Sequence, residues 1–189
     1  ISHVLFMAYF WGNPDKKRQY GGDAPDWLDE VAAISAEGLI MTSGRRQHFL
    51  KTVQKDMLIS LADYFSMEHP LFSSAAIKEM LDKPAVQNKG PQFIRLSRLE
   101  MQALEIYVQS FYAQSRAMID FLIESTGNHM VLKDITLALK GGQSMDVWLS
   151  SLPSEVTQKL GSSVEGMDAK FRSWALAKSQ NMQDYLNAH

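Results

Sequence analysis

Cysteine is missing from this sequence of 189 residues. Its absence excludes disulfide bonds, catalytic thiols, and zinc or iron–sulfur sites that are built on thiolates. It does not fix the redox compartment, because a chain without cysteine is compatible with both the cytoplasm and the periplasm.

Long apolar runs and an excess of one charge are also missing. The longest apolar run, Val4 to Trp11, has eight residues, whereas a helix that spans a bilayer needs about 20. Nineteen basic residues against twenty-one acidic ones give a net charge of −2. We therefore expect no transmembrane segment and no nucleic-acid partner, since binding to nucleic acid requires a basic surface.

Apolar residues at helical spacing are what the sequence does contain. Hydrophobic residues make up 46% of it, which is enough for a core of normal size. Leu58, Leu61, Ala62 and Phe65, for example, recur at helical intervals. No pair of strands is indicated, and residues 15–23 and 83–91 are typical of loops. We predict a mainly α chain, with helices over residues 25–37, 73–81, 98–125, 129–140, 145–151 and 163–186, and a helical or mixed segment over residues 52–65.

The first segment, Ile1 to Trp11, is apolar almost all round. At helical period this pattern predicts a helix that is buried on every side. The sequence starts inside this segment and without an initiator methionine. We therefore expect a fragment or a processed form of a longer protein.

Two short segments carry a resemblance to a known enzyme family. Residues 3–10 read HVLFMAYF, and residues 25–33 read PDWLDEVAA. Together they resemble the paired helices of gluzincin-type zinc metallopeptidases, in which a helix with H-E-x-x-H is followed by a helix with W-L-x-E-x-x-A. In the intact motif both histidines lie on one helix face and bind the same zinc ion, and the glutamate beside the first histidine activates the zinc-bound water.

This resemblance gives His3 the place of the first zinc ligand and Glu30 the place of the third. Val4 then stands where the general base belongs, and Met7 stands where the second histidine belongs. Valine cannot accept a proton, and loss of the base typically costs about 10²–10⁴ in rate. A methionine thioether suits copper(I) better than zinc. His3 and Glu30 are thus interpreted as a two-ligand remnant, and no bound zinc is expected.

Two downstream segments extend the resemblance. Residues 111–118, FYAQSRAM, resemble a Y-x-Q-S-x-A helix start of the same domains, and residues 167–174, MDAKFRSW, resemble their closing helix. A tyrosine from this half of a gluzincin can hydrogen-bond the oxyanion, which makes Tyr112 the candidate for that role. The resemblance implies that residues 1–189 form a single domain, the helical C-terminal half of a zincin-like fold whose sheet would lie upstream.

The broken motif predicts a catalytically inactive, metallopeptidase-like domain that binds a peptide or protein segment, or serves as a scaffold. Its binding cleft would be lined by Trp27, Glu30, Tyr112 and Gln114. Two alternatives stay open. One is an active zinc-dependent peptidase or hydrolase with non-standard ligands or with its motif upstream of Ile1; the other is a plain α-helical interaction domain. Relatives of this general kind are often bacterial and exported, so the resemblance implies a periplasmic location.

The same residues also have ordinary structural interpretations. His3 can be a helix-terminal histidine bonded to backbone or water, and Tyr112 can be a core tyrosine. Glu30 projects from a largely apolar helix face, and a buried, unpaired carboxylate is costly. We therefore expect Glu30 either to find His3, a tyrosine or an arginine as partner, or to carry a raised pKa.

Overall fold

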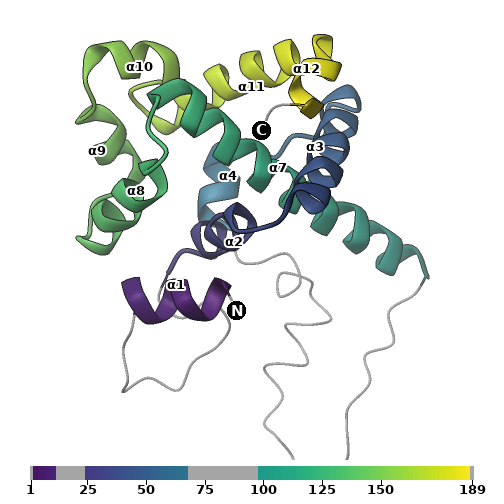
Figure 1. The fold of residues 1–189 in the computed structure, drawn as a ribbon, viewed down its shortest axis with the longest axis horizontal. Helices are drawn as coiled ribbons and strands as arrows, with labels where there is room; N and C mark the ends of the chain where they lie inside the picture. Colours follow the sequence, from purple (N-terminus) through teal and green to yellow (C-terminus); the bar gives the residue numbers. More distant parts are fainter. Residues whose placement is uncertain (1, 12–23, 68–97, 188–189) are drawn as a thin grey trace, which may run out of the picture.

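The computed structural model describes residues 2–11, 24–67 and 98–187, and within these ranges it is helical and contains no strand (Figure 1). This confirms the mainly α prediction. The predicted helix over residues 73–81 and the predicted loops over residues 15–23 and 83–91 lie outside the described residues. The helices are α1 Ser2–Phe10, α2 Asp26–Ser35, α3 Leu39–Gln54, α4 Leu61–Ser66, α7 Arg98–Thr126, α8 Val131–Lys140, α9 Met145–Ser150, α10 Ser154–Leu160, α11 Val164–Gln180 and α12 Met182–Asn187.

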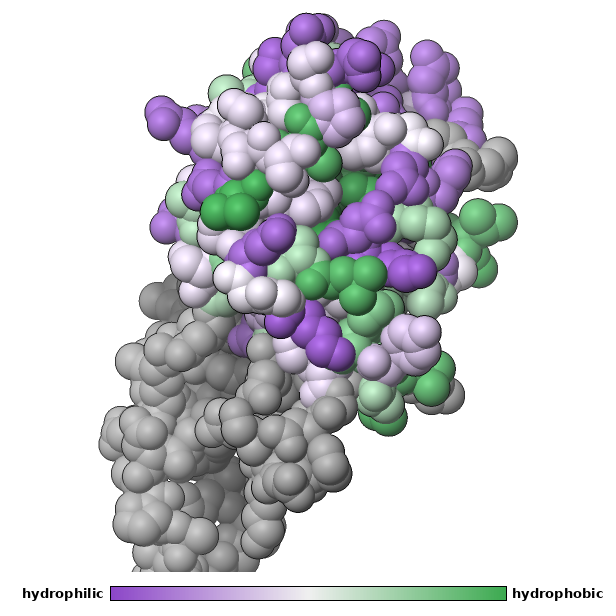
Figure 2. Space-filling view, turned by 90° about the vertical axis from the view of Figure 1, so that its left-hand side faces the viewer, coloured by the Kyte–Doolittle hydropathy of each residue, from purple (hydrophilic) through white to green (hydrophobic). Residues whose placement is uncertain are grey.

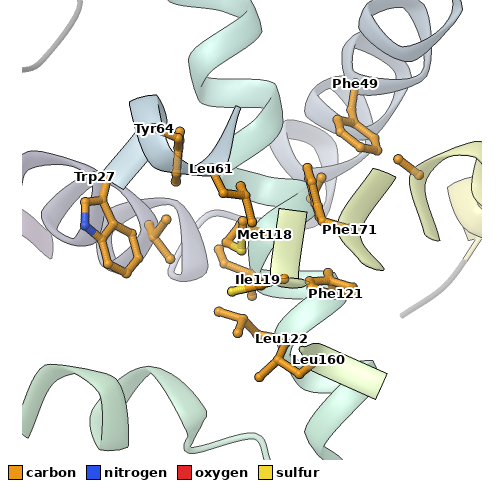
Figure 3. Close-up of a cluster of buried hydrophobic side chains, with 14 of the residues drawn as sticks. Trp27, Phe49, Leu61, Tyr64, Met118, Ile119, Phe121, Leu122, Leu160 and Phe171 are labelled. Atoms are coloured by element: carbon orange, nitrogen blue, oxygen red, sulfur yellow. The ribbon is translucent and has the colours of Figure 1, made fainter. Parts of the chain in front are cut away.

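The long helix α7 crosses the middle of the molecule, and α2, α3, α10 and α11 pack against it (Figure 1). Its 29 residues confirm the predicted helix over 98–125 and carry large apolar side chains at helical spacing. Phe111, Met118 and Leu122 on this helix are at most 1% exposed. They meet Trp27 of α2 and other buried side chains in one hydrophobic cluster (Figure 3). None of the described helices has the length and apolar character of a membrane span.

A buried carboxylate on α7 ties two further helices to it. Arg46 of α3 donates two hydrogen bonds to Asp120, at 2.9 and 3.0 Å, and the hydroxyl of Tyr185 on α12 donates a third at 3.0 Å. Arg116 donates to the same carboxylate from one turn earlier on α7. Burial by itself raises the pKa of Asp120, but the hydrogen bonds and charges of Arg46 and Arg116 outweigh it and the pKa is lowered. The carboxylate therefore stays ionised and fixes α3 and α12 on α7.

The prediction that the first helix is buried on every side was wrong. Helix α1 forms, but Val4, Leu5 and Tyr9 are 70%, 64% and 79% exposed. Within the described part of the chain, α1 packs against α2 and α8, and these two helices cover only part of its surface. Apolar composition predicted the helix correctly, whereas burial depends on how many neighbours are present.

Residues 52–65, which were predicted to be helical or mixed, combine the end of α3, a break in the chain and most of α4. Asp56 has a φ of 52°, and the Ser60 side chain caps α4 by accepting a bond from the Asp63 backbone. Between them, Ile59 is held by a buried side chain: the Gln114 amide donates to its carbonyl at 2.8 Å and accepts from its N–H at 2.9 Å. These tertiary bonds replace the helical ones that the apolar spacing had suggested.

Two other helices depart from the sequence-based prediction. Most of α3 was not predicted, because its segment is polar, contains Gly44 and has little apolar periodicity. It is stabilised by the side chains that it buries, including Phe49 and Leu50. The predicted helix over 163–186 is divided into α11 and α12 at Asn181, and the short helix α10 was not predicted.

Two glycines allow opposite predictions about stability. Gly161 follows α10 with a φ of 96°, and a Cβ placed there would lie 2.4 Å from the Met167 backbone nitrogen. We expect Gly161→Ala to lower the free energy of unfolding by more than about 2 kcal/mol. Gly44 lies inside α3 with open space around it, so Gly44→Ala should raise this free energy by about 0.5–1 kcal/mol. Urea denaturation measures both, and a loss of similar size at the two positions would contradict this account.

Candidate functional site

The candidate site lies where the first turn of α1 meets α2. His3 is 33% exposed, whereas the side chains of Asp29 and Glu30 on α2 are 2% and 3% exposed. The Nδ1 atom of His3 lies 2.9 Å from Oδ2 of Asp29, and its Nε2 atom lies 3.9 Å from Oε1 of Glu30. Each ring nitrogen therefore faces one of two neighbouring buried carboxylates.

Asp29 is the residue of this group that sequence reasoning missed. Burial raises the pKa of Asp29, and the hydrogen bond and charge of His3 offset this only in part; the negative charges of Glu30 and Asp26 raise it further. Its second oxygen, Oδ1, is buried and has no hydrogen-bond partner among the described residues. Two adjacent acids in the sequence, Asp29 and Glu30, were the only signal that could have suggested a second buried carboxylate.

The contact with Asp29 fixes the orientation of the His3 ring. An ionised carboxylate only accepts hydrogen bonds, so this contact places a proton on Nδ1 and turns Nε2 toward Glu30. This is the arrangement of metal-binding histidines, whose second nitrogen is commonly held by a carboxylate. The structure thus brings together the two residues that the resemblance named as ligands, His3 and Glu30, and adds a carboxylate that orients one of them.

The His3–Glu30 separation is wider than a shared zinc ion requires. Zinc lies about 2.0–2.2 Å from nitrogen and oxygen ligands, so a tetrahedral angle places two donor atoms about 3.4 Å apart. The observed 3.9 Å exceeds this value, and the two side chains would have to move closer to bind one ion. Among the described residues, no group of three or more histidine or acidic side chains is arranged to hold a metal ion. A zinc site, which needs at least three protein ligands, is therefore not complete within the described part of the chain.

The negative charge of Glu30 contributes to the raised pKa of two tyrosines, Tyr64 and Tyr112. Burial and the negative charge of Glu30 raise the pKa of Tyr112 to about 12, while Arg45 lowers it. Tyr64 is fully buried, its hydroxyl lies 2.7 Å from Oγ of Ser115, and burial raises its pKa. Tyr112 is half-buried, whereas Tyr64 is fully buried and its hydroxyl is bonded to Ser115.

The other residues that the sequence analysis assigned to this site lie elsewhere or face outward. Val4 is exposed, and the side chain of Met7 lies outside what the structure describes. Trp27 is 2% exposed and packs against Phe65, with ring centroids 4.6 Å apart and ring planes tilted by 53°. Gln114 is fully buried, and its amide is bonded to the backbone between α3 and α4. Gln114 therefore supports the fold with its amide already bonded, whereas Trp27 lines a different cavity, together with Phe65 and Asp168.

An apolar groove of about 520 Å³ adjoins the site. It lies between α1, α2 and α8, and its lining includes Leu5, Phe6 and Tyr9 from the helix that carries His3. Figure 2 views the molecule from the side of α1, α8 and α9 and shows hydrophobic residues interspersed with hydrophilic ones on that face. The groove provides apolar surface beside the polar group of His3, Asp29 and Glu30.

Comparisons with known proteins do not place the chain in a family. No family model matches it, and neither a curated protein nor a solved structure matches it.

The raised pKa of Asp29 predicts a pH-dependent cost to stability. The folded protein holds the Asp29 proton more tightly than the unfolded chain does. Protonation of Asp29 therefore contributes to the free energy of unfolding. This contribution is fully present below the unfolded pKa, about 3.9, and is lost as the pH rises through the raised folded pKa. Asp29→Asn removes the ionisation but keeps an acceptor for His3. In metal-free protein, we expect the unfolding free energy of the variant, relative to the original, to increase as the pH rises from about 4 to about 7.

Urea denaturation over this pH range, with a chelator present, measures the effect. Asp184→Asn is the matched control, because Asp184 is exposed on α12. A difference between the Asp29 variant and the original protein that does not change with pH would show that burial of this carboxylate carries no cost.

Proposed function

We propose that this chain is the helical half of a zinc-dependent metallopeptidase, in which His3 and Glu30 are zinc ligands and Asp29 orients His3. The observation that carries this proposal is the pair of buried carboxylates facing the two nitrogens of one histidine. The substrate would be a peptide segment bound across α1 and α2.

The free-energy cost of burying two carboxylates favours a functional site over a site that has lost its function. Buried carboxylates are destabilising unless they are fully bonded, and Asp29 keeps one buried oxygen without a partner among the described residues. Mutation toward asparagine or an apolar residue would relieve that cost, so a decayed site would be expected to lose this pair. Functional sites are where such costs are retained.

His3 lies in the first turn of α1, and this position permits an alignment different from the one based on sequence alone. If His3 is the second histidine of H-E-x-x-H, the first histidine and the general base would stand four and three positions before it, and both would lie on the His3 face of a helix that continued there. Val4 and Met7 then need no catalytic role. This alignment predicts that the gene encodes His-Glu directly before Ile1, and any other dipeptide there would contradict it.

In this proposal the residues of the chain divide the chemical tasks. Bound zinc would act as a Lewis acid that polarises a peptide carbonyl and acidifies a bound water. Asp29 keeps the proton on His3 Nδ1, so that Nε2 is available as a ligand. Tyr112, whose raised pKa keeps its proton at neutral pH, is the donor for a developing oxyanion. The apolar groove beside α1 would accept apolar side chains of the substrate.

A second candidate function is a peptide-binding domain without catalysis, as the sequence analysis suggested. It is favoured by the number of ligands, because the described residues provide two and not three. In this version His3 and the two carboxylates form a polar anchor for a bound segment. The two candidate functions predict different zinc contents and different peptidase activities for the purified protein.

The test is zinc content and peptidase activity of the protein expressed with all the sequence that the gene encodes before His3. We expect one zinc per chain by elemental analysis, and loss of that zinc in His3→Ala and in Glu30→Gln. Asp29→Asn should weaken zinc binding by about 10–100-fold, the usual effect of removing the group that orients a ligand. Removal of zinc with a chelator should abolish cleavage of unfolded peptides, and added zinc should restore it.

Matched controls separate these effects from general ones. His129→Ala and Glu155→Gln change an exposed histidine and an exposed glutamate outside the site, and neither should alter zinc content. Protein that binds peptides but contains no zinc would support the second candidate and overturn the first.

A further inference from the structure

A cavity of about 770 Å³ is lined by residues of α2, α4, α8, α9 and α11. Neither His3 nor Glu30 is among its lining residues. Its volume lies within the range of about 300–1,000 Å³ that is usual for ligand pockets. The cavity is therefore large enough for a short peptide segment, and it is separate from the residues of the proposed zinc site.

Part of the cavity wall is apolar. Phe65 of α4, Leu139 of α8 and Val164 of α11 line it, and all three are partly buried side chains packed on the core. Phe65 lies against Trp27, which also lines the cavity. Surface of this kind accepts methylene groups, including the aliphatic stem of a lysine or arginine side chain.

The charged residues of the lining are all acidic. Asp146, Glu165 and Asp168 line the cavity, and within the described part of the chain no lysine, arginine or histidine does so. Asp168 is already bonded, since it accepts from the backbone N–H of Leu61 at 2.8 Å and from Nε of Arg172 at 2.7 Å. The charge of Asp168 is therefore balanced, and the cavity owes its negative character to the other two carboxylates.

Asp146 and Glu165 keep oxygen atoms for a ligand. Both residues are exposed. Oδ1 of Asp146 accepts from the backbone N–H of Val164 at 2.7 Å, which joins α9 to the start of α11 and leaves Oδ2 unused among the described residues. Glu165 has no hydrogen bond or ion pair within that part of the chain. The two side chains come from different helices and both line the same cavity, so one cation can interact with both.

The indole N–H of Trp27 is a buried donor that needs an acceptor. The residue is 2% exposed, its ring packs against those of Tyr64 and Phe65, and its N–H donates no hydrogen bond within the described residues. Figure 3 shows the indole nitrogen on the side of the ring that is turned away from Met118 and Ile119 in the core. A buried donor without a partner is costly, and a bound acceptor removes that cost. Because the ring lines the cavity, a carbonyl oxygen bound there can fill this role.

We propose that this cavity binds a peptide segment of a partner protein that presents a basic side chain. The stem of that side chain lies along the apolar wall, its charged end lies at Asp146 and Glu165, and a backbone carbonyl of the segment accepts from the Trp27 N–H. Charge complementarity favours this occupant, because an acidic segment would be repelled by the same carboxylates. The site depends neither on zinc nor on peptidase activity.

The test is the binding of two matched peptides, followed in ¹H–¹⁵N NMR spectra of the tryptophan indole groups. One is a blocked tripeptide with lysine between two leucines, and the other has norleucine in place of lysine, which keeps the stem and removes the charge. We expect the lysine peptide to shift the Trp27 indole resonance and to bind at least about 5-fold more tightly. Trp27→Phe assigns the resonance. The Trp174 N–H, which donates to Glu124 at 2.8 Å, is the internal control and should not shift.

Two substitutions test the acidic residues. Asp146→Asn and Glu165→Gln should each weaken binding of the lysine peptide by about 2–5-fold and leave binding of the norleucine peptide unchanged. Both positions are exposed, and asparagine keeps the oxygen that accepts from Val164, so both variants should fold. Glu155→Gln changes an exposed glutamate of α10 that does not line the cavity, and it is the matched control.

Equal affinity for the two peptides, or a Trp27 resonance that does not shift at millimolar peptide, would overturn the proposal. So would unchanged affinity for the lysine peptide in both acidic variants. Choline chloride is the last probe. If it displaces the lysine peptide and shifts the Trp27 resonance to the same extent at the same concentration, the cavity is a site for small organic cations, and the peptide segment is ruled out as its specific occupant.

Discussion

Two neighbouring carboxylates, Asp29 and Glu30, are almost completely removed from water, and the rest of the site depends on how their charge is balanced. Burial disfavours the ionised form of each, and two negative charges side by side disfavour it further. His3 offsets this with both of its ring nitrogens, which ties the first turn of α1 to α2. The contact explains why this exposed, apolar helix has a defined position: a polar interaction orients it, and α2 and α8 cover part of its surface.

Helix α7 is fixed in place by buried hydrogen bonds as well as by the hydrophobic core. Asp120 receives bonds from three side chains and joins α3 and α12 to α7. One turn and a half earlier, Gln114 and Ser115 on the same helix bond to Ile59 and Tyr64. Tyr112 lies at the start of this bonded stretch, and its ring contacts the guanidinium of Arg45, which is paired with Glu37.

The sequence predicted those elements that are determined by neighbouring residues in the chain, and missed those that depend on contacts between distant residues. The apolar spacing of residues 98–125 predicted α7, and that of residues 129–140 predicted α8, because burial of one helix face leaves its period in the sequence. The break between α3 and α4 was not predictable in this way, since it depends on Gln114, 55 residues further along the chain. For the site, the resemblance named His3, Glu30 and Tyr112, whereas Asp29 was identified only by its contacts.

The sequence by itself determined that the chain is mainly helical, that it contains no thiol chemistry, and that His3 and Glu30 are residue types able to share an ion. The first two conclusions follow from composition and from spacing within single helices, and the third follows from residue type. Only the tertiary structure decided that both nitrogens of His3 face carboxylates, that Val4 points to solvent, and that Gln114 supports a loop instead of lining a cleft. These outcomes depend on which helices pack together, and packing is decided by contacts between residues far apart in the chain.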